Sequence, residues 1–135
     1  MMSRIRINIV TTAAVAISGC LMALMVGGQT APKAKSPVIE QTEYFALPGK
    51  SEEVYRWRIH ACDVREKIGL PRGRVLRREG NSDTLADVMW QIEYPDEAAR
   101  ERDLKVRAES SEFEAVRSHM NTLIRHFERG FWRQN

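Results

Sequence analysis

The sequence predicts an α+β domain with an antiparallel sheet, which follows a hydrophobic segment at the N-terminus. Two patterns predict the domain. Apolar and polar residues alternate over residues 88–94, as in a strand with one buried face, and the apolar residues of 113–123 recur at helical spacing. A third observation predicts the N-terminal segment, because the 22 residues from Ile7 to Gly28 carry no charge. The 135-residue length is that of one ordinary domain.

Residues 1–28 have the pattern of a secretory signal peptide or membrane anchor. Arg4 and Arg6 are their only charged residues and precede an uncharged run that is long enough to cross a bilayer. Three fates remain open. Ile17–Cys20 is similar to a bacterial lipobox, in which Cys20 would be lipidated to give a lipoprotein. Cleavage after Gly28 would release a periplasmic protein, and an uncleaved segment would be a single-pass anchor. Each fate exports the remaining chain, because the two arginines hold the N-terminus inside.

Residues 29–51 predict a linker, because three prolines interrupt a stretch that is rich in alanine and lysine. The folded domain is therefore predicted for residues 52–135. Beyond residue 28 the chain has 19 Lys+Arg, after removal of two from 21, against 18 Asp+Glu. This near balance predicts no nucleic-acid partner, since no basic surface is indicated.

The first half of the domain predicts strands around one short helix. Residues 53–61 alternate between apolar and polar and predict a first strand. Residues 62–71 allow one or two helical turns before a glycine and a proline end them. Residues 73–79 predict a second, short strand, and residues 88–94 predict the third, after a polar turn.

The second half predicts helices and a closing strand. Asp96 can cap a first helix, and Ser111 with Glu114 forms a capping box for a second helical stretch. Residues 124–133 predict a strand with a bulge at Gly130. The order is strand, short helix, strand, strand, long helix, strand, which is the ferredoxin-like βαββαβ order of an α+β fold.

Residues 87–120 resemble the dimeric α/β-barrel superfamily, most closely its NIPSNAP-like and antibiotic-biosynthesis-monooxygenase-like domains. The resemblance implies a homodimer, and the superfamily includes cofactor-free oxygenases, haem proteins and domains without known chemistry. Its members have a first helix of three turns, so the short helix predicted for this chain is a departure. The matching residues are Trp90, Tyr94-Pro95-Asp96-Glu97, Arg100 and Ser111-Glu112-Phe113.

Five polar residues form the candidate pocket or dimer face: Arg56, Arg58, His60, Gln91 and Glu93. In a ferredoxin-like sheet the first and third strands are neighbours, so these side chains would share the face opposite the helices. Arg58 with Glu93 would then be the natural ion pair. Such a face could bind a small anion or carbonyl compound. The alternative is a solvated or dimer-packed face, which the sequence favours.

Histidine and cysteine side chains predict no metal site and no cofactor. His60, Cys62 and Asp63 stand close together, but the spacing of a zinc site is absent from the sequence. They are interpreted as a strand–helix junction in which Asp63 caps the helix. His119 or His126 could serve as an axial haem ligand in view of the superfamily resemblance, but surface positions on a charged helix are favoured.

Two hypotheses for function follow. The first is an exported, membrane-tethered domain that self-associates and acts as a binding or interaction module. The alternative is a small enzyme of the cofactor-free oxygenase type, or a haem-binding protein, that uses a pocket between sheet and helices. Whether the chain is an enzyme is left open, because the sequence contains no recognisable triad, dyad or metal motif.

Export can be tested with a reporter enzyme that is active only outside the cytoplasm, fused after Asn135. We expect activity from the full chain, because Arg4 and Arg6 precede a run of membrane-spanning length. Replacing several residues of this run by aspartate should abolish the activity. A cytoplasmic reporter that is fully active at the same position would contradict export.

Overall fold

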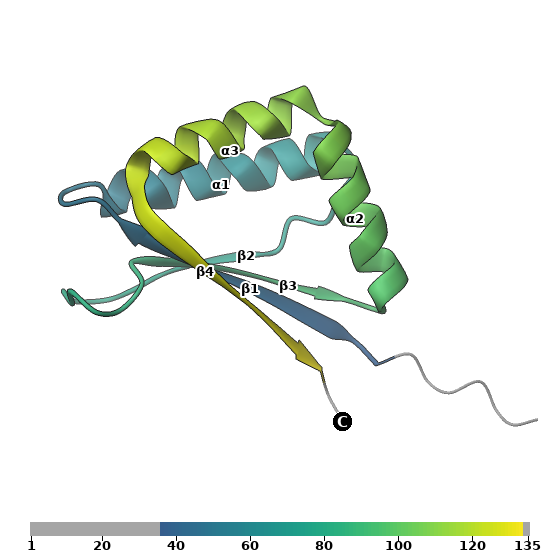
Figure 1. Cartoon of the computed structure of the whole chain (residues 1–135), viewed down its shortest axis with the longest axis horizontal. Helices are drawn as coiled ribbons and strands as arrows, with labels where there is room; N and C mark the ends of the chain where they lie inside the picture. The colour runs from purple at the N-terminus through teal and green to yellow at the C-terminus, as the bar shows by residue number, and fades with distance from the viewer. Residues whose placement is uncertain (1–35, 134–135) are drawn as a thin grey trace, which may run out of the picture. The chain divides into compact units, whose positions relative to one another are not determined.

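The computed structural model describes residues 36–133 (Figure 1). The predicted signal segment, Cys20 and the first part of the predicted linker lie outside these residues. Within residues 36–133, no helix combines the length and the hydropathy that crossing a membrane requires.

A four-stranded antiparallel sheet carries its helices on one face (Figure 1). The strands lie in the order β2-β3-β1-β4, with β1 at Val38–Ala46, β2 at Arg74–Arg77, β3 at Val88–Tyr94 and β4 at Ile124–Arg133. Helices α1 (Ser51–Lys67) and α3 (Ser111–Leu123) run side by side over the sheet. Helix α2 (Glu97–Glu109) lies at one end of this pair. This arrangement is ferredoxin-like, and the predicted α+β class with an antiparallel sheet is confirmed.

The first strand differs from the prediction. Strand β1 lies at Val38–Ala46, inside the segment 29–51 that was predicted as a linker, so the domain begins well before residue 52. The physical reason is that polar residues occupy the helix-facing side of β1. Glu40 and Thr42 are both fully buried there, and their presence removes the apolar alternation by which a half-buried strand is recognised.

The first helix also differs from the prediction. Residues 53–61, predicted as a strand, belong to α1, which is 17 residues long, so the first helix is not shortened. Its buried residues recur at helical spacing, but two of them, Arg58 and Arg65, are charged. The sequence therefore shows no complete apolar stripe at helical spacing. The apolar residues Tyr55, Trp57 and Ile59, which are partly exposed in the helix, alternate with polar residues and gave the pattern of a strand.

The remaining elements agree with the predictions, apart from two local details. The Asp96 side chain caps α2 and accepts a hydrogen bond from the backbone N–H of Ala99 at 2.8 Å. Helix α3 is capped by Ser110 rather than by Ser111, through the backbone N–H of Phe113 at 3.1 Å. The bulge in β4 lies opposite Phe45 and Ala46 rather than at Gly130.

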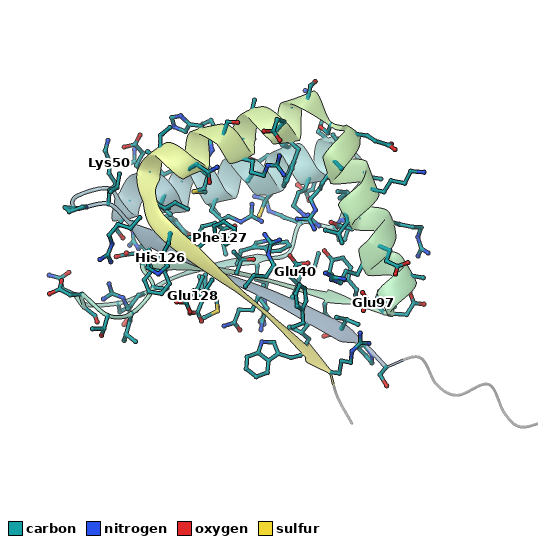
Figure 2. All side chains as sticks on the ribbon, viewed as in Figure 1. Glu40, Lys50, Glu97, His126, Phe127 and Glu128 are labelled. Atoms are coloured by element: carbon teal, nitrogen blue, oxygen red, sulfur yellow. The ribbon has the colours of Figure 1, made fainter. Side chains whose placement is uncertain are left out.

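The face of the sheet that carries no helix is called the outer face below. Directly paired residues of antiparallel strands point to the same side, so the register assigns its members. Figure 2 shows Phe127 on the helix side of β4, and His126 and Glu128 on the other side. The side chains of the outer face are Ile39, Gln41, Glu43, Phe45, Arg74, Leu76, Met89, Gln91, Glu93, His126, Glu128 and Trp132.

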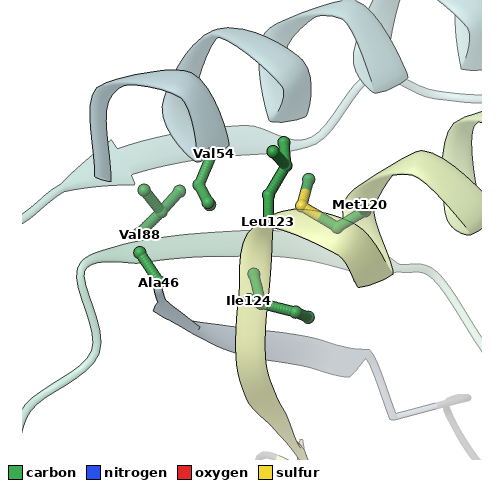
Figure 3. Close-up of a cluster of buried hydrophobic side chains, with 6 residues drawn as sticks. All are labelled: Ala46, Val54, Val88, Met120, Leu123 and Ile124. Atoms are coloured by element: carbon green, nitrogen blue, oxygen red, sulfur yellow. The ribbon is translucent and has the colours of Figure 1, made fainter. Parts of the chain in front are cut away.

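The apolar core lies between the sheet and helices α1 and α3. Its main cluster draws on both helices and three strands (Figure 3), and consists of Ala46, Val54, Val88, Met120, Leu123 and Ile124. Burial of such side chains contributes about 25 cal/mol per Å² of apolar surface. This burial keeps α1 and α3 on the sheet.

Trp90 is the largest side chain of the core and is 1% exposed. Its indole N–H donates a hydrogen bond to the backbone oxygen of Arg72 at 3.1 Å. Gly73 has φ +74°, and a Cβ atom there would collide with the indole ring. Only glycine therefore suits this approach of backbone to ring. Trp57 lies on α1, and its indole N–H donates a hydrogen bond to the backbone oxygen of Val116 at 2.9 Å.

Candidate functional site

The structure does not bring the five predicted face residues together. Gln91 and Glu93 lie on the outer face of β3, whereas the other three belong to α1. Arg56 is exposed and pairs with Glu52 at 3.0 Å, and His60 is exposed beside the ring of Trp57. Arg58 points inward from α1. The predicted Arg58–Glu93 pair is therefore wrong, because the sheet separates the two side chains.

The predicted junction of His60, Cys62 and Asp63 is a continuous helix in which the three side chains diverge. Cys62 is fully buried against the core cluster that contains Trp90. Asp63 is exposed and pairs with Arg72 at 2.6 Å instead of capping a helix. Within residues 36–133, no group of three His, Cys, Asp or Glu side chains is placed to hold a metal ion.

A cavity of about 440 Å³ lies between the sheet and helices α2 and α3. Its closed end is made by buried residues such as Arg58, Ala61 and Trp90, and its mouth by exposed residues such as Ala108 and Phe127. The full lining is Tyr44, Arg58, Ala61, Trp90, Leu104, Arg107, Ala108, Phe113, Val116, Arg117, Met120, Asn121, Ile124, Phe127 and Arg129. None of the three histidines of the chain contributes to it, so the cavity offers a haem no histidine ligand.

Arg58 is the buried charge that lines this cavity. The residue is 4% exposed, and its Cζ atom lies 4.5 Å from the centre of the Trp90 ring and 6.0 Å from that of Tyr44. Both are cation–π distances. Its Nε has no hydrogen-bond partner among residues 36–133. Burial lowers the pKa of Arg58 from its ordinary value, although an arginine keeps its charge at neutral pH.

The neighbouring buried arginine, Arg65, is fully compensated. Its two terminal nitrogens donate to the two carboxylate oxygens of Asp103, and its Nε donates to the backbone oxygen of Pro71 at 2.8 Å. Asp103 also pairs with Arg107 at 2.6 Å. This buried network joins α1 to α2, and bidentate geometry of this kind is the strong form of an ion pair.

A second buried acid, Glu40, lies beneath α2 on β1 (Figure 2). It is fully buried, and its carboxylate oxygens lie 3.3 Å from Arg129, 3.8 Å from Arg107 and 3.9 Å from Arg100. Burial, with help from Asp103 and Glu40, raises the pKa of the nearby Tyr94 to about 12. That hydroxyl therefore stays protonated at neutral pH.

Sequence reasoning placed Arg58 in the candidate set but on the wrong element, and it missed Glu40, Arg65 and Asp103. A signal for part of this group exists in α1. Arg58 and Arg65 are seven residues apart, on the same side of the helix as Val54, Ala61 and Cys62. If the aliphatic part of each arginine side chain is counted as apolar surface, the buried side of α1 becomes a continuous apolar stripe that the sequence can reveal.

Comparisons with known proteins identify the fold. No family model matches the chain, and none of the curated proteins matches its sequence. Solved structures do match. A NIPSNAP family protein from Agrobacterium tumefaciens is 17% identical, with a TM-score of 0.54 over 75% of this chain and 88% of that one. A dimeric protein of unknown function and ferredoxin-like fold from Bacteroides fragilis is 12% identical, with a TM-score of 0.55 over 73% and 96%.

A third match is a protein from Bacteroides thetaiotaomicron that has been proposed to be an antibiotic biosynthesis monooxygenase. It is 14% identical, with a TM-score of 0.51 over 69% of this chain and 84% of that one. These are the structural groups that the motifs around Trp90 and Tyr94 indicated, and the resemblance is confirmed at the level of the fold. Identities this low do not carry over an activity.

The different surroundings of Arg58 and Arg65 predict opposite effects of the same substitution. Arg65→Met should lower the free energy of unfolding by about 3 kcal/mol, because it leaves Asp103 buried without its bidentate partner. Arg58→Met should leave it unchanged or raise it by about 1 kcal/mol, because it removes a buried charge that has no acid partner within residues 36–133. Urea unfolding of both variants measures the difference. Equal losses would show that Arg58 is as firmly compensated as Arg65.

Proposed function

We propose that this chain is a self-associating binding domain, which holds a small organic molecule with an aromatic body in the cavity between the sheet and α2–α3. The cavity itself carries this proposal. Its volume of about 440 Å³ falls within the range of roughly 300–1,000 Å³ that is usual for small-molecule sites. Its wall also has the usual composition, because aromatic and aliphatic side chains predominate over a few polar groups.

The shape of the lining favours a flat, apolar ligand body. Trp90, Phe113 and Phe127 come from three different elements and all border the same space. Aromatic rings prefer offset or edge-to-face contacts with other rings, so a ligand ring can be held from several sides. The ionisable groups of the lining are one tyrosine and four arginines. These groups are suited to binding, since at neutral pH they are donors rather than bases.

Self-association is proposed through the outer face of the sheet. This face carries four large apolar side chains that are at least partly exposed, namely Ile39, Leu76, Met89 and Trp132. Trp132 is 58% exposed and Leu76 is 47% exposed, and a sheet face of this kind is normally covered. The occupant we propose is a second copy of the chain. Two solved proteins of ferredoxin-like fold are dimeric, which supports this proposal.

The proposal includes a location. The sequence of residues 1–28 supports export and attachment to the outer surface of a membrane, through lipidation of Cys20 or through an uncleaved anchor. The binding domain would then act at the periplasmic face.

Blocking the mouth of the cavity tests the binding function. Ala108 and Ala98 both lie exposed on α2, but only Ala108 lines the cavity. We expect the full chain to bind 1-naphthamide, an uncharged aromatic probe, in isothermal titration calorimetry. Ala108→Trp should weaken binding at least about tenfold, which corresponds to ~1.4 kcal/mol, whereas Ala98→Trp should leave it unchanged. An affinity that is unchanged in Ala108→Trp would refute the cavity as the place where the probe binds.

Self-association can be tested with two equally exposed residues. Trp132 on the outer face is 58% exposed, and Leu85 in the β2–β3 loop is 59% exposed. We expect the full chain to sediment as a dimer. Trp132→Glu should produce monomers, because a dimer would bury the new charge, and Leu85→Glu should remain dimeric. Identical masses for both variants would show that the outer face is not the interface.

A further inference from the structure

The charges around the cavity do not balance. Three arginines lie buried or nearly so between α1, α2 and the sheet, namely Arg58, Arg65 and Arg107, and two buried acids, Glu40 and Asp103, lie among them. Arg65 and Arg107 share Asp103, and Glu40 lies next to Arg100, Arg107 and Arg129. Each of these arginines therefore has a buried acid beside it, whereas Arg58 forms no ion pair within residues 36–133.

No carboxylate within residues 36–133 forms an ion pair with Arg58. Two further arginines, Arg65 and Arg107, lie close enough to repel its charge. The guanidinium contacts the aromatic rings of Trp90 and Tyr44 and makes no hydrogen bond with any residue of the described chain. Burial of an uncompensated charge costs several kcal/mol.

The other arginines of the lining differ from Arg58 in this respect. Arg117 has a largely exposed side chain and pairs with Glu114. Arg107 pairs with Asp103, and Arg129 lies next to Glu40. Only Arg58 presents an unpaired cation to the closed end of the cavity, in contact with Trp90.

We infer that the ligand is an aromatic organic anion with one negative charge, such as a carboxylate or an ionised phenol, and that Arg58 is the residue that binds its charged group. This inference rests on the proposed function and specifies its ligand class. The anionic group would supply the hydrogen-bond acceptors that Arg58 lacks, in the charge-assisted form that is stronger than a neutral hydrogen bond. The aromatic body would lie against Trp90 and Phe113, which border the same space.

A matched pair of probes tests this inference. 1-Naphthoate and 1-naphthamide have nearly the same shape, but only the naphthoate is charged at pH 7. In isothermal titration calorimetry with the full chain, naphthoate should bind at least about tenfold more tightly than naphthamide. Arg58→Met should abolish this preference while naphthamide still binds. Arg58→Lys should retain part of it. Arg56→Met, a control on the exposed side of the same helix and outside the cavity lining, should leave it intact.

The outcomes separate the two proposals. Equal affinities of the unsubstituted chain for both probes would overturn the anionic ligand class and leave the cavity as a binding site. A preference for naphthoate that survives in Arg58→Met would overturn the role of Arg58. Binding of neither probe would overturn the proposed function, and the inference with it. Near-ultraviolet circular dichroism of each variant confirms that the comparison is made on folded protein.

Discussion

The position of α2 depends on a buried ion pair. Of the 13 residues of this helix only Asp103 is buried, and it is held by Arg65 of α1 and by Arg107 of its own helix. Apolar burial attaches α1 and α3 to the sheet, but α2 has little of it. A buried ion pair adds little net stability compared with apolar packing, yet its geometry is strict, so it can determine where a helix lies. The cavity wall formed by Leu104, Arg107 and Ala108 is placed by this pair.

This dependence gives the two buried arginines of α1 separate tasks. Arg65 fixes the scaffold, because each of its three guanidinium nitrogens donates a hydrogen bond within the domain. Arg58 does the reverse and keeps a charge in a place where folding alone would favour an apolar side chain. Natural proteins retain such locally unfavourable residues at sites of function. This contrast within one helix separates Arg65, which has a structural role, from Arg58, for which we propose a role in binding.

The sequence predicted the elements whose signals are local. The alternation over Val88–Tyr94 and the serine and acidic residues around 110–114 lie within a few residues of the structure that they specify. Strand β1 and helix α1 were missed for a common reason. Both turn charged or polar residues toward the core, Glu40 in one case and Arg58 in the other, and hydropathy patterns cannot identify a buried stripe that contains charges.

The candidate site could be predicted only in part, because its contacts join distant segments. Arg65 and Asp103 are 38 residues apart. Arg107 pairs with Asp103 from four residues away, but this spacing is also that of an ordinary exposed ion pair on a helix, so it does not reveal burial. The resemblance carried by Trp90 and the residues after Tyr94 indicated the fold correctly. It could not indicate the cavity chemistry, which is set by the pairing of arginines with two acids. That pairing exists only once α1, α2 and β1 have come together.

The free edge of the sheet has a consequence for solubility. Strand β4 is ten residues long and forms one edge, and it carries three exposed aromatic side chains, Phe127, Phe131 and Trp132. A long edge strand with exposed apolar side chains is a template for aggregation. Arg129 lies between these aromatic residues and Arg133 directly follows them, and charged residues on an edge discourage pairing with another chain. An exchange of these arginines for uncharged residues would thus change how the protein behaves at high concentration, whatever it does to the cavity.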